Sequence, residues 1–241
     1  LMVQIILFVS AILLYVGVYP YSGYRQTKNM RQNTVNIETD KSGLYKQSMI
    51  LSWIPALIIT TIILLDGYTL SSLGLSLKLK KDNCFSKWVV FITLVSCIVY
   101  FCYLIYIIVA VKLDRKKRAK YAKEIPNELK IVLPVTQKEK KWWKAMALSA
   151  GITEELQYRG YLFFAIPLLF PDCSIWVVWI VSSLIFGIGH VYQGKEAIKP
   201  LLAGFYFGFV YVALGSIIPT ILLHFLQDLS VNDILSERHY N

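Results

Sequence analysis

The amino-acid sequence predicts an all-α fold, a polytopic bundle of about seven transmembrane helices. Hydrophobic residues account for 56% of the 241 residues and the mean hydropathy is +0.53, which is more apolar than is usual for a soluble domain. Apolar stretches of about 17–25 residues recur along the chain, and a helix of that length crosses about 30 Å of hydrocarbon. The stretches are continuous rather than alternating, which favours helices over strands.

Seven segments fit this description, and each is expected to form one span. We expect them at residues 1–19, 49–66, 87–111, 145–166, 174–190, 200–215 and 216–232. The first lacks the basic start and the small-residue cleavage site of a signal peptide, so we interpret it as a retained helix. The polar residues 21–48 are predicted to form a long loop. In the sixth segment Gly204 and Gly208 form a GxxxG pair, which favours close helix packing.

Basic residues are concentrated in a few of the connections. Residues 112–144 alone hold 12 of the 25 Lys and Arg residues. With the N-terminus outside, 20 of the 25 lie in inside segments and four in outside segments. Because cytoplasmic loops carry the excess of Lys and Arg, we expect a multi-pass protein of the cell membrane with its C-terminus in the cytoplasm. Trp142 and Trp143, which follow two lysines, are interpreted as anchors at that interface.

The net charge of +10 therefore follows from membrane topology, and nucleic acid is not expected as a partner. The lipid bilayer is the expected surrounding. Contact with anionic lipid or an acidic partner is the alternative interpretation of the basic loop at residues 112–144, which is also a candidate for recruiting a substrate.

Ionisable residues stand where apolar spans should have none. They are Glu154, Glu155, Arg159, His190, His224 and Asp228. A charge at the bilayer centre costs about 2.5–3.5 kcal/mol even on the lenient insertion scale. We therefore expect these groups to face one another or a water-filled cavity, and to mark a functional site in the cytoplasmic half of the C-terminal helices.

The spacing within each segment suggests how these groups divide their roles. Glu155 and Arg159 are four residues apart on one helix face, a good geometry for an ion pair. Glu154 points about 100° away, which leaves its carboxylate free to act as a general base. His224 and Asp228 share the same four-residue spacing, as do Phe186 and His190.

Three motifs in this part of the chain resemble those of a known family. Glu154 to Arg159 looks like EExxxR, Phe186 to His190 looks like FxxxH, and His224 to Asp228 looks like HxxxD/N. In that order, on successive hydrophobic segments, they resemble the CPBP or Abi family of type II CAAX prenyl endopeptidases and bacteriocin-processing or immunity proteins. The resemblance covers residues 145–232, and the first three spans carry no recognisable signature.

This resemblance implies a membrane endopeptidase of the glutamic type, with no metal and no cofactor. Glu154, assisted by His190, would activate the water that attacks a peptide bond of a peptide or membrane-protein substrate at the cytoplasmic side. His224 and Asp228 would face the oxyanion, where an imidazole N–H can stabilise the negative charge. Glu155, Arg159 and Phe186 would be structural or would form the pocket. None of these residues is expected to bind metal.

Asp228 departs from the prenyl-processing branch, which has Asn at this position, although the bacterial branch tolerates Asp. An ionised carboxylate cannot donate to an oxyanion, so we expect Asp228 to orient His224 instead. The chain would then divide into three N-terminal helices (1–111), a basic cytoplasmic loop (112–144), the catalytic core (145–232) and a C-terminal tail (233–241).

Other functions remain open. A non-catalytic immunity or regulatory scaffold protein, acting on a membrane-protein partner, would also retain this motif set. A zinc protease could use the two histidines with Glu and Asp, although the sequence lacks HExxH. A proton-coupled transporter could use intramembrane carboxylates, but no internal repeat is recognisable. The substrate is not indicated: a prenylated protein, a bacteriocin leader or a signalling propeptide would each be consistent.

Overall fold

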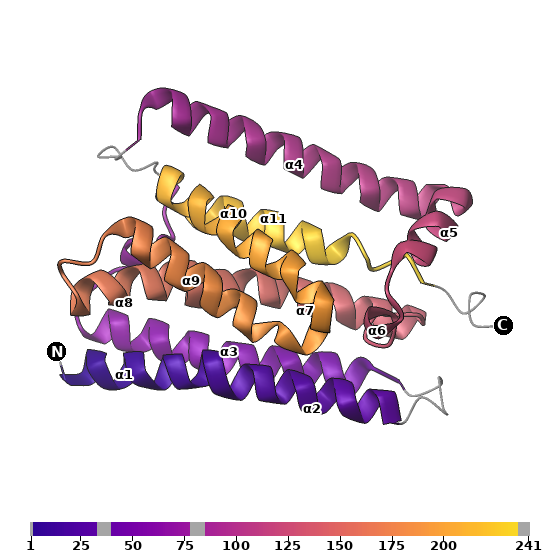
Figure 1. Cartoon of the computed structure of the whole chain (residues 1–241), viewed down its shortest axis with the longest axis horizontal. Coiled ribbons are helices and arrows are strands. Elements are labelled where there is room, and N and C mark those ends of the chain that lie inside the picture. Colours follow the sequence, from indigo (N-terminus) through magenta and orange to yellow (C-terminus); the bar gives the residue numbers. More distant parts are fainter. Residues whose placement is uncertain (1, 33–39, 78–84, 236–241) are drawn as a thin grey trace.

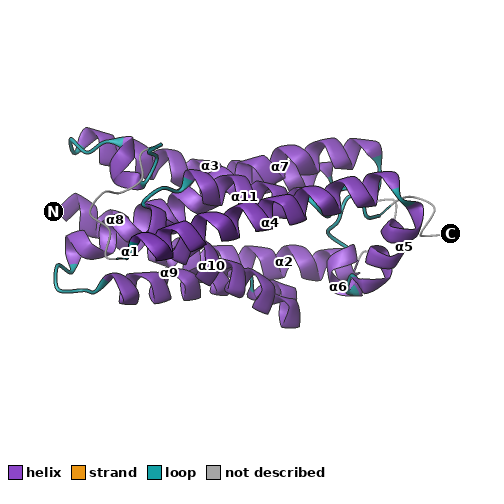
Figure 2. Cartoon of the chain, turned by 90° about the horizontal axis from the view of Figure 1, so that it is seen from above, coloured by secondary structure: helices purple, strands orange, loops and turns teal. Residues whose placement is uncertain are grey.

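Helices are the only regular secondary structure in residues 2–32, 40–77 and 85–235, the parts of the chain that the computed structural model describes. The long helices run side by side along one axis (Figure 1). The same arrangement is seen from above, where the helices again lie along the long axis (Figure 2). The predicted all-α class is therefore confirmed for these residues.

The N-terminal part consists of long helices. They are α1 (Met2–Leu13), a π-helical turn η1 (Leu14–Val18), α2 (Tyr19–Gln32), α3 (Ser42–Leu65), a 3-10 turn η2 (Leu70–Leu73) and α4 (Lys87–Leu113). Two short helices follow, α5 (Arg115–Glu124) and α6 (Asn127–Lys130).

The C-terminal part contains the segments that carry the motifs. They are α7 (Gln137–Glu155), a π-helical stretch η3 (Leu156–Tyr161), α8 (Leu162–Leu169), α9 (Ile175–Gly189), a 3-10 stretch η4 (Val191–Ala197), α10 (Ile198–Leu214) and α11 (Ile218–Leu229). A capping box between Thr136 and Glu139 fixes the start of α7, because each side chain accepts a hydrogen bond from the other's backbone N–H.

The predicted loop at residues 21–48 is wrong at both of its ends. The first helix continues through α2 to Gln32, and α3 already begins at Ser42. Ser22 and Gly23 suggested a turn, yet Gly23 lies inside α2, where Tyr192 of η4 packs directly against its backbone. This tertiary contact, together with the bond from Thr27 Oγ1 to the Gly23 carbonyl (2.8 Å), offsets the low helix propensity of glycine. Residues 33–39 lie outside the described part.

Four helices are long and apolar enough to cross a membrane. They are Met2–Met30, Ser42–Leu65, Lys87–Leu113 and Val191–Leu214, and the helices Ile175–Gly189 and Ile218–Leu229 are apolar but shorter. These helices make the chain a multi-pass membrane protein. All seven predicted spans coincide with helical segments, but seven crossings and the orientation of the termini stay predictions.

Close contacts between α7, α9, α10 and α11 place the motif residues near one another. The expected close packing at Gly204 and Gly208 is confirmed, because α10 lies against α9 there. A Cβ atom at Gly204 would lie 3.2 Å from the Ser183 carbonyl oxygen, and one at Gly208 would lie 2.6 Å from the Trp179 ring. Only glycine allows this approach.

Candidate active site

The motif residues meet around one cavity of about 610 Å³ inside the helical bundle. Its walls come from α2, α3, α5, α6, α7, η3, α9, η4, α10 and α11. The lining residues include four that the sequence singled out as catalytic: Glu154, His190, His224 and Asp228. Phe186 and Tyr158 line the same cavity. Glu154 and Asp228, 74 positions apart in the sequence, thus line one cavity.

Glu155 and Arg159 form the ion pair that their spacing predicts. Arg159 Nη1 donates to Glu155 Oε1 at 2.8 Å, and both side chains are fully buried. The pair lies where α7 passes into the π-helical stretch η3. Two buried charges are tolerated when they are paired and further hydrogen-bonded. The other partners of Arg159 and Glu155 therefore determine whether the pair is stable and which helices it connects.

The Arg159 guanidinium is held by α9 and α10 as well as by its own helix. Arg159 Nη2 donates to the Gly204 carbonyl at 3.1 Å. The ring of Phe186 lies 4.4 Å from the guanidinium carbon and the ring of Phe207 lies 5.6 Å from it, both within cation–π range. Phe186 of the FxxxH motif therefore packs on the arginine of the EExxxR motif.

Glu155 also holds the imidazole of His224, which differs from the expected role of Asp228. His224 Nδ1 lies 2.9 Å from Glu155 Oε1, whereas Asp228 Oδ2 lies 3.8 Å from His224 Nε2. Because Glu155 also accepts from Arg159, its carboxylate is the acceptor and His224 Nδ1 is the donor. Sequence spacing placed His224 and Asp228 on one face but could not reveal a partner 69 residues earlier.

A glycine in α7 permits the contact between Glu155 and His224. A Cβ atom on Gly151 would lie 3.0 Å from the Ile221 carbonyl oxygen and 3.1 Å from the Phe225 backbone nitrogen. The backbones of α7 and α11 thus nearly touch one helical turn before Glu155. A larger residue at this point would separate the two motifs that the hydrogen bond joins.

Glu154 faces the cavity rather than the ion pair. Its Oε2 atom lies 3.8 Å from His224 Nε2 and, among the described residues, has no hydrogen-bond partner. The side chain is 24% exposed, whereas that of Glu155 is fully buried. Glu154 is thus the member of the pair that lines the cavity, whereas Glu155 does not.

His190 ends α9 and is oriented by its own helix. Its Nδ1 lies 2.9 Å from the Phe186 carbonyl oxygen, which can only accept, so Nδ1 carries the hydrogen and Nε2 is left as the other ring nitrogen. The ring lies between Phe186, at 4.8 Å between centroids, and Tyr192, at 6.1 Å. Tyr192 in turn packs against Gly23 of α2.

Trp143 corrects another expectation. Instead of anchoring the chain at the membrane interface, its side chain is 8% exposed and packs edge-on against Tyr45 of α3. Its indole N–H donates to the Asp228 backbone carbonyl at 2.8 Å, which fixes the end of α11 beside the cavity. Trp142 is more accessible, with the Lys46 ammonium 4.2 Å from its ring.

Gln157 and Tyr158 are site residues that sequence reasoning missed, because both occupy unspecified positions of EExxxR. Gln157 Nε2 donates to the carbonyls of Ser52 and Thr153, at 3.2 and 3.0 Å, and so joins η3 to α3. A polar glutamine within an apolar segment was the sequence signal for such a contact between helices. In the structure Gln157 is fully buried. Tyr158 packs edge-on against Phe186, and both line the cavity. π-helical turns such as η3 are frequent at functional sites.

The comparisons with known proteins agree with the motifs. Residues 138–230 match the family model described as type II CAAX prenyl endopeptidase Rce1-like, and this range contains all six ionisable residues of the cluster. No curated protein and no solved structure matches the chain. Within the described residues, no group of three or more His, Cys, Asp or Glu side chains is arranged to hold a metal ion.

Proposed function

We propose that this membrane protease, which belongs through residues 138–230 to the family of type II CAAX prenyl endopeptidases, Rce1-like, cleaves its substrate by a glutamic-type mechanism. The observation that carries the proposal is the separation of two adjacent glutamates. Glu155 is fully buried between Arg159 and His224, while Glu154 lines the cavity and keeps 24% of its side chain exposed. One carboxylate thus holds the site together and the other can act on water.

Glu154 acts as the general base in this proposal. Its carboxylate takes a proton from a water molecule, and the water oxygen attacks the carbonyl carbon of the scissile peptide bond. His190 assists by accepting a hydrogen bond from the same water through Nε2, because its Nδ1 is bound to Phe186. When the C–N bond breaks, the proton passes from Glu154 to the leaving amine.

His224 is proposed to stabilise the oxyanion of the tetrahedral intermediate. Its Nδ1 donates to Glu155, so a hydrogen bond from Nε2 to the oxyanion requires the doubly protonated ring. Glu154 and Asp228, each 3.8 Å from Nε2, place negative charge beside that ring. Asp228 is therefore proposed as a cavity residue that balances the charge of His224, and Glu155 as the positioning residue.

The substrate is proposed to be a peptide or a protein segment that reaches the cavity from the cytoplasmic side. Support comes from the composition of the cavity walls beyond the four catalytic side chains. They include Tyr121, Ile125, Pro126 and Leu129 from the basic region between α4 and α7, which the positive-inside rule places in the cytoplasm.

The test compares the terminal peptides of host cells carrying the wild-type chain, a deletion, or the deletion complemented with Glu154→Gln. We expect new protein termini with the wild-type chain only. Asp172→Asn is the control, because it also replaces a carboxylate by an amide, at an exposed position that does not line the cavity. It should restore the wild-type termini.

Two outcomes would contradict the mechanism. If Glu154→Gln restores both the wild-type termini and the wild-type phenotype, Glu154 is not the base. If Glu154→Gln restores the phenotype and the termini do not differ between any of the strains, the protein acts as a non-catalytic scaffold. If purified protein holds one equivalent of metal and loses cleavage on chelation, the metal-independent part of the proposal fails.

A further inference from the structure

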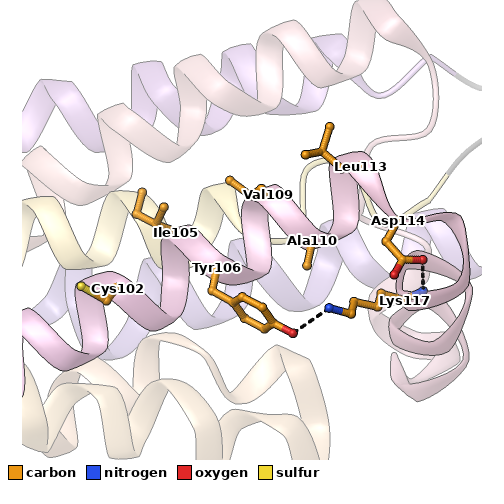
Figure 3. Close-up of a pocket in the computed structure, with 8 residues that line it drawn as sticks. All are labelled: Cys102, Ile105, Tyr106, Val109, Ala110, Leu113, Asp114 and Lys117. Carbon is orange, nitrogen blue, oxygen red and sulfur yellow. Dashed lines mark hydrogen bonds between the residues drawn. The ribbon is translucent and has the colours of Figure 1, made fainter.

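A second cavity lies outside the proposed active site, on the surface where α4 ends and α5 begins. Its volume is about 470 Å³, and none of its lining residues belongs to the catalytic cavity. Figure 3 shows the eight lining residues: Cys102, Ile105, Tyr106, Val109, Ala110, Leu113, Asp114 and Lys117. From this groove we infer a binding site for one anionic phospholipid, a function independent of the proposed protease activity.

The α4 part of the groove is an apolar stripe on an outward-facing surface. Ile105, Val109 and Leu113 follow one another at four-residue intervals and project from the same face of the helix (Figure 3). Their side chains are 37%, 47% and 77% exposed. The stripe extends about 12 Å at 1.5 Å per residue. Such a surface on a membrane-crossing helix suits an acyl chain lying along it.

The α5 end of the groove is polar and carries a cation. Lys117 Nζ donates to the Tyr106 hydroxyl at 2.8 Å and lies 4.9 Å from the centre of the Tyr106 ring (Figure 3). This hydrogen bond raises the pKa of Lys117, so the ammonium remains charged. The ammonium is therefore held on Tyr106 within the groove, where it can pair with the phosphate of a lipid whose acyl chain lies along α4.

The one acidic side chain in the groove is already engaged. Asp114 Oδ1 accepts from the backbone N–H groups of Lys116 and Lys117, at 2.8 and 3.1 Å, and so caps the N-terminus of α5. These bonds, led by that from Lys117, hold the pKa of Asp114 below its usual value. Asp114 thus orders the first turn of α5, which presents Lys117 toward Tyr106.

The charge of α5 favours an anionic occupant. Six of its ten residues are Lys or Arg, and Lys112 precedes them at the end of α4. Among the described residues, the single salt bridge made by an α5 side chain joins Lys120 to Glu124, within the helix itself. Clusters of four to eight basic residues directly after a membrane helix attract anionic lipid headgroups. An apolar stripe that ends in such a cluster matches a molecule with an acyl chain and a phosphate.

The experiment measures lipid binding to the purified full-length chain by native mass spectrometry in detergent. The probes are palmitoyl-oleoyl phosphatidylglycerol and the phosphatidylcholine with the same chains. We expect the first bound complex to form at a phosphatidylglycerol concentration at least five-fold lower than for phosphatidylcholine. Lys116→Gln combined with Lys117→Gln should remove this preference, and Val109→Trp, which fills the stripe, should weaken binding of phosphatidylglycerol.

The matched control is Lys141→Gln combined with Lys144→Gln, which removes the same charge from exposed positions of α7. Equal loss of preference in this control would overturn the proposal, because any cationic surface would then suffice. Equal binding of the two lipids by the wild-type chain would also overturn it.

Glycerol phosphate and a soluble poly-glutamate peptide serve as competitors without acyl chains. If either displaces the lipid at equal concentration, the groove recognises a free phosphate or an acidic protein instead. Variants that lose their helical circular dichroism are replaced by Tyr106→Phe, which deletes only the lysine-holding hydroxyl and should reduce the preference.

Discussion

Arg159 joins three helices through a single guanidinium. It binds Glu155 of its own helix, the Gly204 carbonyl of α10 and the face of Phe186 in α9. Glu155 in turn accepts a hydrogen bond from His224 of α11, so the position of the imidazole depends on the same ion pair. The Glu–Arg pair, recognised by its spacing, is therefore the point at which all three motifs connect.

Replacing Arg159 alone should leave Glu155 as an unpaired buried charge. We expect Arg159→Met to lower the free energy of unfolding by about 3–5 kcal/mol, the usual cost of breaking one half of a buried pair. The measurement is denaturant unfolding in mixed micelles. Lys138→Met is the control: Lys138 pairs with Asp40, but its side chain is 66% exposed, so the loss should be at most about 1 kcal/mol.

The double variant Arg159→Met with Glu155→Gln separates charge from packing. It removes both charges and should recover part of the lost stability, although His224 loses its charged partner. A single Arg159→Met variant as stable as Lys138→Met would contradict this account of the pair.

Gly23 is predicted to control His190 through Tyr192. A Cβ atom at Gly23 would lie 2.4 Å from the Tyr192 ring, which is the near neighbour of the His190 ring. We expect Gly23→Ala to reduce cleavage at least ten-fold while the protein still inserts and remains folded. Gly17→Ala in the same continuous helix meets nothing within 4 Å and should keep near wild-type cleavage.

Cleavage rates of the two alanine variants, normalised to the amount of folded protein, provide the measurement. Equal rates would show that α2 does not influence His190. Trimming the ring in a Gly23→Ala, Tyr192→Leu double variant should relieve the clash, so a rate above that of Gly23→Ala alone would locate the effect at this contact.

At the scale of elements, the approach of α7 to α11 determines whether Glu155 reaches His224. We expect Gly151→Ala to destabilise the protein by about 1–3 kcal/mol, because the nearest atoms belong to the α11 backbone and cannot rotate away. Gly43→Ala in α3 meets nothing within 4 Å and should be neutral or stabilising. Thermal unfolding in detergent compares the two, and a neutral Gly151→Ala would mean that the helices separate freely.

The seven helical segments could be predicted because long apolar runs have few alternatives in a membrane. The helix α2 could not, because its polar residues border a cavity and its Gly23 looks like a turn until Tyr192 packs against it. The partner of His224 was missed for a related reason. Four-residue spacing determines which side chains share a face, but only helix packing determines that Glu155 approaches from α7.

At the scale of the whole molecule, the basic residues predict which end of the bundle faces the cytoplasm. We expect a cysteine placed at Lys120 in α5 to be labelled from the cytoplasm only. A cysteine at Leu77, whose side chain is 89% exposed, should be labelled from outside only. Both are tested by an impermeant maleimide in a chain whose four native cysteines are replaced by alanine. The reverse labelling pattern would invert the topology and with it the proposed side of cleavage.

The hydrophobic composition predicts a membrane protein, and the ionisable residues in its apolar segments predict a site. Neither predicts the volume of the cavity or the residues that line it. The candidate active-site cavity of about 610 Å³ is lined by residues as distant as Tyr19 and Ile234. Those walls depend on the packing of α2 and α5, whose polar sequences carry no periodic apolar signal. The motif spacing therefore located the chemistry of the site, while its volume and its entrance required the structure.

The buried Glu155–Arg159 pair also has a consequence for biogenesis. The segment that carries it leaves the ribosome well before its partners: the Gly204 carbonyl follows 45 residues after Arg159, and His224 follows 69 residues after Glu155. Until those groups are synthesised, Glu155 and Arg159 can form an ion pair with each other but lack their hydrogen-bond partners in α10 and α11. We therefore expect stable entry of this helix into the lipid to wait for α10 and α11, so that α7 to α11 assemble as a unit rather than one helix at a time.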